Sequence, residues 1–220
     1  RGEAPVADSN AQARDCSRPF CSGTPGGTAT TSASSFAVRQ PRNRKLVLLL
    51  VIVSSLALLL AAYTAGMLTQ RPDLWRIGFW IGLTLVTSWS PIRLPGGMMA
   101  TPNSAPLIAS IFDYALPQPF AVVWIALLGT FSLRELRREI PWYGAVYNHA
   151  NLAIAGAAAW LALGVVREAA STADLAGLVL AIASVGATVL LVNSVLSVSA
   201  VSLRTHTPFA RVWALGVASV

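Results

Sequence analysis

The sequence predicts an all-α membrane protein, a polytopic helix bundle of about six transmembrane helices plus the start of a seventh. Hydrophobic residues make up 55% of the chain and charged residues only 11%, and the mean hydropathy is +0.61. Soluble domains are rarely this apolar. Several apolar stretches also approach or exceed the roughly 20 residues that a helix needs to cross a bilayer. The lipid bilayer is therefore the expected partner of this chain.

The formal charge of +7 does not indicate a nucleic-acid-binding protein. The sixteen Lys and Arg residues stand in short clusters between apolar stretches rather than along one face of a helix. That arrangement is typical of the positive-inside rule, by which basic loops stay in the cytoplasm and meet anionic lipid. We therefore expect no nucleic-acid partner, and we keep a homodimer as an open alternative.

Residues 1–45 differ in composition from the rest of the chain. They are rich in Ser, Thr, Gly, Pro and Ala, so they bury too little surface to offset the entropy lost on ordering. We predict a disordered N-terminal tail over residues 1–45 and a membrane bundle over residues 46–220. Cys16 and Cys21 lie in this tail without further Cys or His nearby, so no metal site is expected. Because the chain starts without Met and stops inside an apolar run, we expect it to be a fragment.

The first predicted span covers residues 46–68, which contain no charged residue. The basic segment 39–45 precedes it and is expected to hold the N-terminus in the cytoplasm. A second span covers residues 77–89. Within it, Gly78 and Gly82 have the GxxxG spacing that permits close packing of helices.

The middle of the chain is less regular. Residues 90–106 contain four prolines and two adjacent glycines, so we expect a loop or a re-entrant element covered by protein or water. Residues 107–116 and 120–133 form two apolar segments on either side of a Pro-Gln-Pro break. Both are shorter than a usual span, which predicts a tilted or half-spanning pair or helices extended by loop residues.

Two long apolar helices are predicted in the second half, over residues 143–166 and 175–203. Asp174 precedes the second of them and is a suitable N-cap. The run that begins at residue 212 is the expected start of a seventh span.

The distribution of basic residues supports this alternation of spans. With the N-terminus in the cytoplasm, the outer loops carry only Arg71, Arg76 and Arg167. The inner loops carry Arg39, Arg42, Arg44, Lys45, Arg93, Arg134, Arg137, Arg138, Arg204 and Arg211. This asymmetry is what the positive-inside rule predicts.

The sequence contains none of the motifs of nucleotide-binding loops, serine hydrolases or zinc proteases. We therefore expect no enzyme activity within these residues and no cofactor. The polar side chains at membrane depth are the remaining candidates, because burying such groups is costly and often functional. They are Asp113, Asn148, His149, Asn151 and Asn193.

Asp113 and His149 each have two interpretations. Asp113 either shares a buried site with Asn148 or His149, or lies near the end of a short helix at the outer interface, which we favour. His149 either senses protons or is a satisfied interface residue, which is the commoner case for a single histidine.

The two asparagines of α-helical segment 143–166 begin a stripe of small residues. At helical spacing this stripe consists of Asn148, Asn151, Ala155, Ala158 and Ala162. Small-residue stripes face other helices rather than lipid, so we expect both asparagines to make inter-helix hydrogen bonds of about 1 kcal/mol each. A role in ligand binding or signalling remains the alternative.

The run "LLGTFSLRELRREIPWYGAVYNHANLAIAG" (127–156) resembles the N-terminal multi-pass membrane region of bacterial signalling proteins with HD-GYP or GGDEF output domains. The resemblance rests on Gly129, the basic loop 134–138, the Pro-aromatic segment 141–143, and Tyr147-Asn148 with Ala150-Asn151. "IRLPGG" (92–97) and "THTPFARVWA" (205–214) fit the same pattern.

The resemblance implies a sensory, membrane-anchoring module in the bacterial cytoplasmic (inner) membrane. It further implies an output domain beyond Val220, of the HD-GYP cyclic-di-GMP phosphodiesterase type, and an unidentified small-molecule stimulus. Two alternatives stay open. One is the substrate-binding membrane component of a small-molecule transporter, whose broken helices would line a cavity; the other is a structural membrane protein without a ligand.

Overall fold

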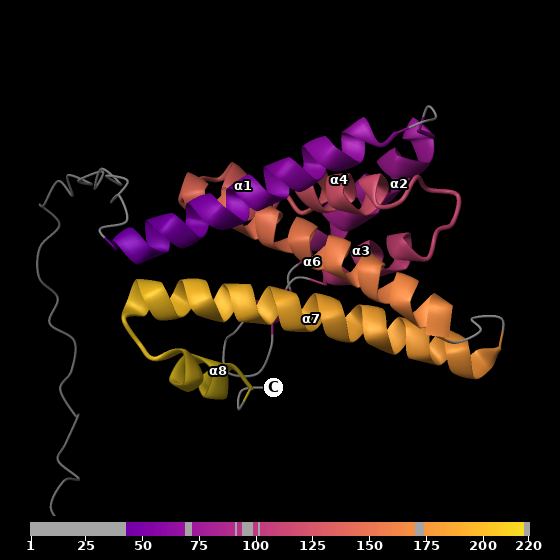
Figure 1. The fold of residues 1–220 in the computed structure, drawn as a ribbon. Helices are drawn as coiled ribbons and strands as arrows, with labels where there is room; N and C mark the ends of the chain where they lie inside the picture. Colours follow the sequence, from indigo (N-terminus) through magenta and orange to yellow (C-terminus); the bar gives the residue numbers. More distant parts are fainter. Residues whose placement is uncertain are drawn as a thin grey trace, which may run out of the picture. The chain divides into compact units, whose positions relative to one another are not determined.

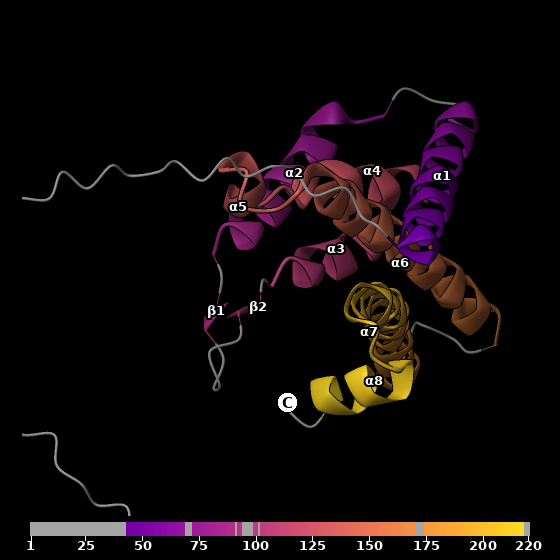
Figure 2. The ribbon, with the colours of Figure 1, turned by 90° about the vertical axis from the view of Figure 1, so that its left-hand side faces the viewer.

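The computed structural model describes residues 43–68, 72–90, 92–93, 99–100, 102–169 and 174–217. These residues form eight helices and one short β ladder. Figures 1 and 2 show how these elements are arranged. The predicted disordered tail lies outside them up to residue 42, so that prediction stays untested. Part of the irregular segment 90–106 also lies outside the described residues.

The helices are α1 (Arg44–Gly66), α2 (Leu74–Ser88), α3 (Ser104–Ile111), α4 (Phe120–Gly129), α5 (Leu133–Leu136), α6 (Trp142–Ala169), α7 (Leu175–Thr205) and α8 (Phe209–Val217). Between α2 and α3, β1 (Ile92–Arg93) pairs antiparallel with β2 (Met99–Ala100). Asp174 is the N-cap of α7, as predicted, because its Oδ1 accepts a hydrogen bond of 2.9 Å from the Gly177 amide.

Three helices of the described chain, α1, α6 and α7, are long and apolar enough to cross a membrane. Their lengths are about 35, 42 and 46 Å at 1.5 Å per residue. By the same measure α2 and α4 are about 22 and 15 Å long, below the bilayer core of about 30 Å. The prediction of a helical membrane protein is therefore supported, whereas the prediction of about six full spans is not.

The predicted pair of short helices in the middle of the chain is present, with changed boundaries. The first helix begins at Ser104 and ends at Ile111, and the second ends at Gly129 rather than at residue 133. The chain turns at 112–119, where prolines interrupt regular hydrogen bonding.

Helix α8 occupies the stretch predicted as the start of a seventh span. His206 ends α7 in the left-handed conformation, with φ of 56°, and the chain turns there. Helix α8 contacts α7 and lies beneath its C-terminal part in Figure 1. Its Phe209 and Trp213 rings stack with centroids 5.7 Å apart, while Arg211 is exposed. The described residues do not support a seventh span.

Helix α6 is the centre of the packing, with contacts to α1, α3, α4 and α7. It lies between α4 and α7 in both ribbon views (Figures 1 and 2). Of its most apolar stretch 56% is buried, against 22% for the corresponding stretches of α1 and α7. The exposed leucines, valines and isoleucines of α1 and α7 therefore form the apolar outer surface that lipid would cover.

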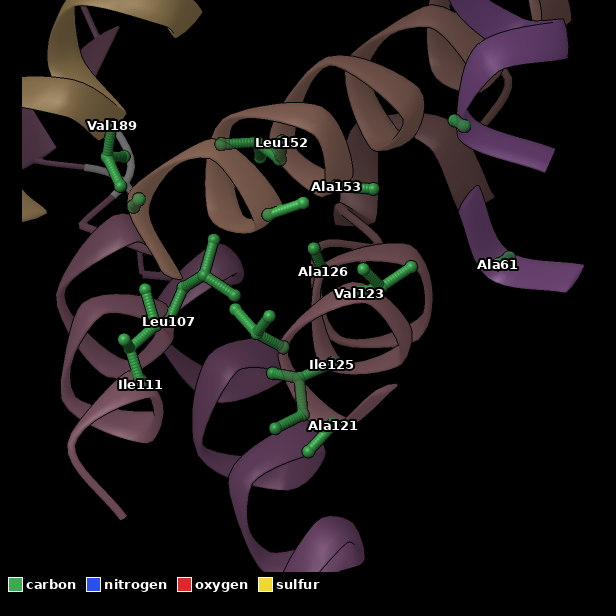
Figure 3. Packing of buried hydrophobic residues seen from close by; sticks show 14 of the residues in the cluster. Ala61, Leu107, Ile111, Ala121, Val123, Ile125, Ala126, Leu152, Ala153 and Val189 are labelled. Atoms are coloured by element: carbon green, nitrogen blue, oxygen red, sulfur yellow. The ribbon is translucent and has the colours of Figure 1, made fainter. Parts of the chain in front are cut away.

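The core lies between α3, α4 and α6. Helix α4 is the most completely buried element, since Ala121, Val122, Val123, Ile125 and Ala126 have no exposed surface. In the close view, Ala153 of α6 lies next to Ala126 and Val123, with Leu107 and Ile111 of α3 on the other side (Figure 3). Small residues on both helices allow this close approach, which explains how a helix of ten residues is held in place.

Close glycine packing occurs, but not at the predicted GxxxG pair. A Cβ atom on Gly78 or Gly82 would meet no described atom within 4 Å. In contrast, a Cβ on Gly129 would lie 2.8 Å from the Thr84 Cβ, and one on Gly156 would lie 3.0 Å from the Val122 Cγ2. The glycines that bring helices together are thus in α4 and α6, because these two helices are surrounded by others.

Candidate functional site

The predicted site residues divide between the two ends of α6. Asn148, His149 and Asn151 lie in its first third. Asp113 belongs to the other end, because the ring of the adjacent Tyr114 lies 4.4 Å from the guanidinium of Arg167. The eighteen positions from His149 to Arg167 span about 27 Å of helix. The alternative that pairs Asp113 with Asn148 or His149 is therefore not what the structure shows.

Asp113 lies just after α3 and binds two residues of α2. Its Oδ2 accepts a hydrogen bond of 2.9 Å from the Trp80 Nε1 and lies 3.6 Å from the Arg76 Nε. Its Oδ1 accepts a bond of 3.2 Å from the Ala115 amide. The Arg76 and Asp113 side chains are 43% and 21% exposed. This arrangement agrees with the favoured interpretation of an acid near the end of a short helix.

Replacing Asp113 with asparagine should change the free energy of unfolding by less than about 1 kcal/mol, because a partly exposed ion pair contributes little and the amide oxygen still accepts from Trp80. Thermal and denaturant unfolding of the purified protein in detergent would measure this. A larger loss would mean that the Arg76 pair is shielded from solvent.

His149 is the centre of a buried polar chain. Its Nδ1 lies 2.6 Å from the Thr130 Oγ1, and its Nε2 lies 3.2 Å from the Glu135 Oε2. The residue is only 8% exposed, and its ring lies against the ring of Phe131, with centroids 4.9 Å apart. Helix α6 is thus joined through one imidazole to the segment that follows α4.

The Thr130 hydroxyl links the protonation of His149 to the backbone of α4. Its oxygen lies 2.6 Å from the Ala126 carbonyl oxygen, to which it donates. A hydroxyl has only one proton, so in this arrangement the Thr130 oxygen can only accept a hydrogen bond from the His149 Nδ1–H. The His149 Nε2 must then also carry a proton in order to donate to the Glu135 carboxylate. If the hydroxyl turns to donate to Nδ1, a neutral imidazole satisfies Glu135 through Nε2–H. Rotation of one hydroxyl therefore distinguishes the two charge states.

Glu135 is held by the start of α5. Its Oε2 accepts a hydrogen bond of 3.0 Å from the Ser132 amide, and the Ser132 Oγ accepts one of 3.3 Å from the Glu135 amide, which is a capping box. Burial raises the pKa of Glu135. The hydrogen bonds from His149 and Ser132 and the electrostatic interaction with His149 lower it, and together they outweigh the effect of burial, so the pKa lies below its ordinary value. The carboxylate is therefore ionised at neutral pH.

Glu135 was not among the predicted site residues because it stands in the charged segment 134–139, which is typical of a solvated loop. The signal that could have found it is the sequence Ser132-Leu133-Arg134-Glu135. A serine followed three residues later by glutamate predicts a capping box and hence an ordered carboxylate.

Asn151 joins α6 to α7. Its Nδ2 donates to the Asn193 Oδ1 at 2.7 Å and to the Ser197 Oγ at 3.2 Å, and the residue is 2% exposed. Nearby, the Tyr147 hydroxyl donates to the Leu196 carbonyl oxygen at 2.7 Å. No described residue donates a hydrogen bond to the Asn151 Oδ1, although this oxygen is buried.

The predicted small-residue stripe is buried only in part. Asn151 and Ala155 are buried, Ala158 and Ala162 are half-buried, and Asn148 is exposed. The expectation that both asparagines face protein therefore holds for Asn151 alone. Asn148 instead borders a cavity.

This polar cavity has a volume of about 530 Å³ and lies beside the first third of α6. Its polar wall includes Thr130, Glu135, Asn148, Asn151, Asn193 and Ser197. Ile140, Leu152, Val189 and Leu190 form the apolar part of the wall. The volume lies within the range of about 300–1,000 Å³ that is usual for small-molecule sites. No group of three His, Cys, Asp or Glu side chains that could hold a metal ion occurs in the described segments.

The polar cavity lies at the more basic end of the bundle. The Asn43 Nδ2 donates to the Leu203 carbonyl oxygen at 2.6 Å, so α1 begins where α7 ends. The Trp89 Nε1 donates to the Phe131 carbonyl oxygen at 3.0 Å, which brings the end of α2 to the same place. The basic residues of these segments are Arg44, Lys45, Arg134, Arg137, Arg138, Arg204 and Arg211. The opposite end has Arg76 and Arg167 beside Asp73, Asp113, Glu168 and Asp174.

Comparisons with protein-family models, with curated proteins and with solved structures return no match for this chain. The resemblance to the membrane regions of HD-GYP and GGDEF signalling proteins therefore stays a prediction from sequence motifs.

Proposed function

We propose that this chain is the membrane-anchoring sensory module of a bacterial signal-transduction protein and controls a cytoplasmic output domain. The observation that carries the proposal is the buried pair of His149 and Glu135 beside the polar cavity. A buried pair of titratable groups is costly to maintain, so its presence between helices favours a regulatory role over simple anchoring.

The proposed mechanism is a shift between two packing states of α6. Glu135 and Thr130 belong to the segment after α4, whereas Asn151 belongs to the contact with α7. A ligand in the polar cavity, or a change in the charge of His149, would act on both contacts at once. A ligand that binds one packing state better shifts the population toward that state, and α7 would transmit the change to the basic end of the bundle.

The same geometry supports an inner-membrane orientation with a cytoplasmic N-terminus. Most basic residues lie at the end where α1 begins and α7 ends, which the positive-inside rule assigns to the cytoplasm. Helices α1, α2, α3, α4, α6 and α7 also alternate in direction between the two ends. We therefore retain six crossing elements as part of the proposal, with the short helices α2, α3 and α4 enclosed by the long ones.

Two measurements test this function. The reading frame past Val220 should encode a cytoplasmic signalling domain with His-Asp signatures; a stop codon or the second half of a solute carrier would contradict the proposal. In cells that express the full-length protein, Glu135→Gln should change the cyclic-di-GMP level, because it removes the charge beside His149. Asp113→Asn, at the other end of the bundle, is the matched control and should not.

The transporter alternative is favoured by one observation, the polar cavity of about 530 Å³. A substrate-binding component predicts uptake of a solute by proteoliposomes, lost on Asn148→Ala. Asp113→Ala should leave that uptake unchanged, because Asp113 does not line the cavity. Uptake that Asn148→Ala abolishes and Asp113→Ala leaves unchanged would favour the transporter function and contradict the sensory proposal.

A further inference from the structure

We propose that the polar cavity binds a small organic cation whose ammonium group carries N–H donors and whose remainder is a short apolar chain. This inference rests on the proposed function and deepens it, because it names the chemical class of the stimulus. It depends on three properties of the cavity wall: its hydrogen-bond acceptors, its charge and its apolar part.

The cavity wall contains hydrogen-bond acceptors that receive no hydrogen bond from the described residues. The buried Asn151 Oδ1 receives no hydrogen bond from the described chain, and leaving such an oxygen unsatisfied is costly. Glu135 accepts from Ser132 and His149 through Oε2 only, so its Oε1 has no donor among the described residues. A ligand in this cavity gains most by donating hydrogen bonds.

The charge of the wall favours a cation. Glu135 is 5% exposed in its side chain and is ionised, because its pKa is lowered. Arg134 also borders the cavity, but it pairs with Glu139 at 3.3 Å and its side chain is 63% exposed, so water screens its charge. A hydrogen bond between an ammonium group and a carboxylate is about twice as strong as one between neutral groups.

The rest of the wall limits the ligand's size and shape. Leu152, Val189 and Leu190 form an apolar surface that a short alkyl chain would cover. Asn193 and Ser197 are already engaged by Asn151, so they hold its amide in place. The site therefore suits a primary amine with a short aliphatic part better than a free inorganic cation.

The test compares two cations with the same charge and the same propyl chain, n-propylammonium and propyltrimethylammonium chloride, of which the second has N-methyl groups in place of N–H donors. Thermal unfolding of the whole chain in nanodiscs would be followed with each at equal ionic strength. n-Propylammonium at about tenfold above its Kd should raise Tm by about 3–5 °C, and propyltrimethylammonium should not. Asn151→Leu and Glu135→Gln should lose the shift.

Gln118→Leu is the matched control. Gln118 also has a buried amide oxygen without a described partner, but it lies in the 112–119 turn at the opposite end of the bundle. The shift should persist in this variant. If the Asn151 and Glu135 variants do not fold, the comparison of the two cations on the unmodified protein still decides the question.

Equal shifts from the two cations, no shift from n-propylammonium, or an unchanged shift in Asn151→Leu would each overturn the inference. These failures differ from failure of the proposed function. If no amine binds but Glu135→Gln still alters cyclic-di-GMP, only the ligand class is wrong. If the amine binds but the reading frame encodes no signalling domain, only the sensory function is wrong.

Discussion

Replacing His149 with leucine while Glu135 is kept should destabilise the folded bundle by about 3–5 kcal/mol, because removing one partner leaves a buried carboxylate without the side chain that compensates it. The Glu135 side chain is 5% exposed and the His149 side chain 10%, so water screens the pair little. The matching change, Glu135→Leu, should have a similar effect and also removes the capping box. The measurement is thermal and denaturant unfolding in one detergent.

A double-mutant cycle separates the pair from the helix caps. His149→Leu with Glu135→Leu should be more stable than the sum of the single changes predicts, with a coupling of about 1–3 kcal/mol. The control is His206→Asn, which alters the exposed second histidine but keeps a residue type that tolerates the left-handed conformation; it should cost no more than about 0.5 kcal/mol. Additive effects in the cycle would mean that the two side chains do not interact.

The lowered pKa of Glu135 also predicts how stability depends on pH. The folded-state pKa lies below the ordinary value of 4.5. The contribution of Glu135 is therefore fully present above that value and is lost as the pH falls through the folded-state pKa. Between pH 7 and pH 3, Tm should fall less in Glu135→Gln than in the unmodified protein. If Tm falls equally with pH in both proteins, the pKa of Glu135 is not lowered in the folded state.

Gly129→Ala should be the most damaging single-methyl addition among the helix glycines, with a loss of about 1–3 kcal/mol. The new Cβ would lie 2.8 Å from the Thr84 Cβ and 3.1 Å from the Ile81 carbonyl oxygen. Both atoms are fixed to the backbone of α2, so relief requires α2 and α4 to move apart. Unfolding of the purified protein measures the loss, and Gly129→Leu should increase it.

Gly78→Ala is the matched control for this prediction. It lies on α2 as well, but its Cβ would meet no described atom within 4 Å. Alanine is favoured over glycine inside a helix by about 1 kcal/mol, so Gly78→Ala should be neutral or stabilising. If Gly78→Ala proves more harmful than Gly129→Ala, the GxxxG pair packs against a surface outside the described chain.

Several features could be predicted because they depend on residues close together in the sequence. Long uncharged runs predict α1, α6 and α7, since hydropathy summed along a segment reports its preference for lipid. The Asp174 cap was predicted correctly because an N-cap needs only a side chain and an amide three residues away. The position of Asp113 just after the end of α3 followed from its closeness to a proline break.

The candidate site depended instead on how the helices pack. His149 meets Glu135 across the break at Pro141, and Asn151 meets Asn193, which is 42 positions away. Periodicity assigns a residue to a face of its own helix, but not to the neighbour that this face will contact or to the rotation between them. For the same reason the close glycine contact falls at Gly129 and not at Gly78. Local composition determined that the chain forms helices long and apolar enough to cross a membrane. Only the tertiary structure decided which polar groups enclose the cavity, because those contacts arise from the relative positions of helices far apart in sequence.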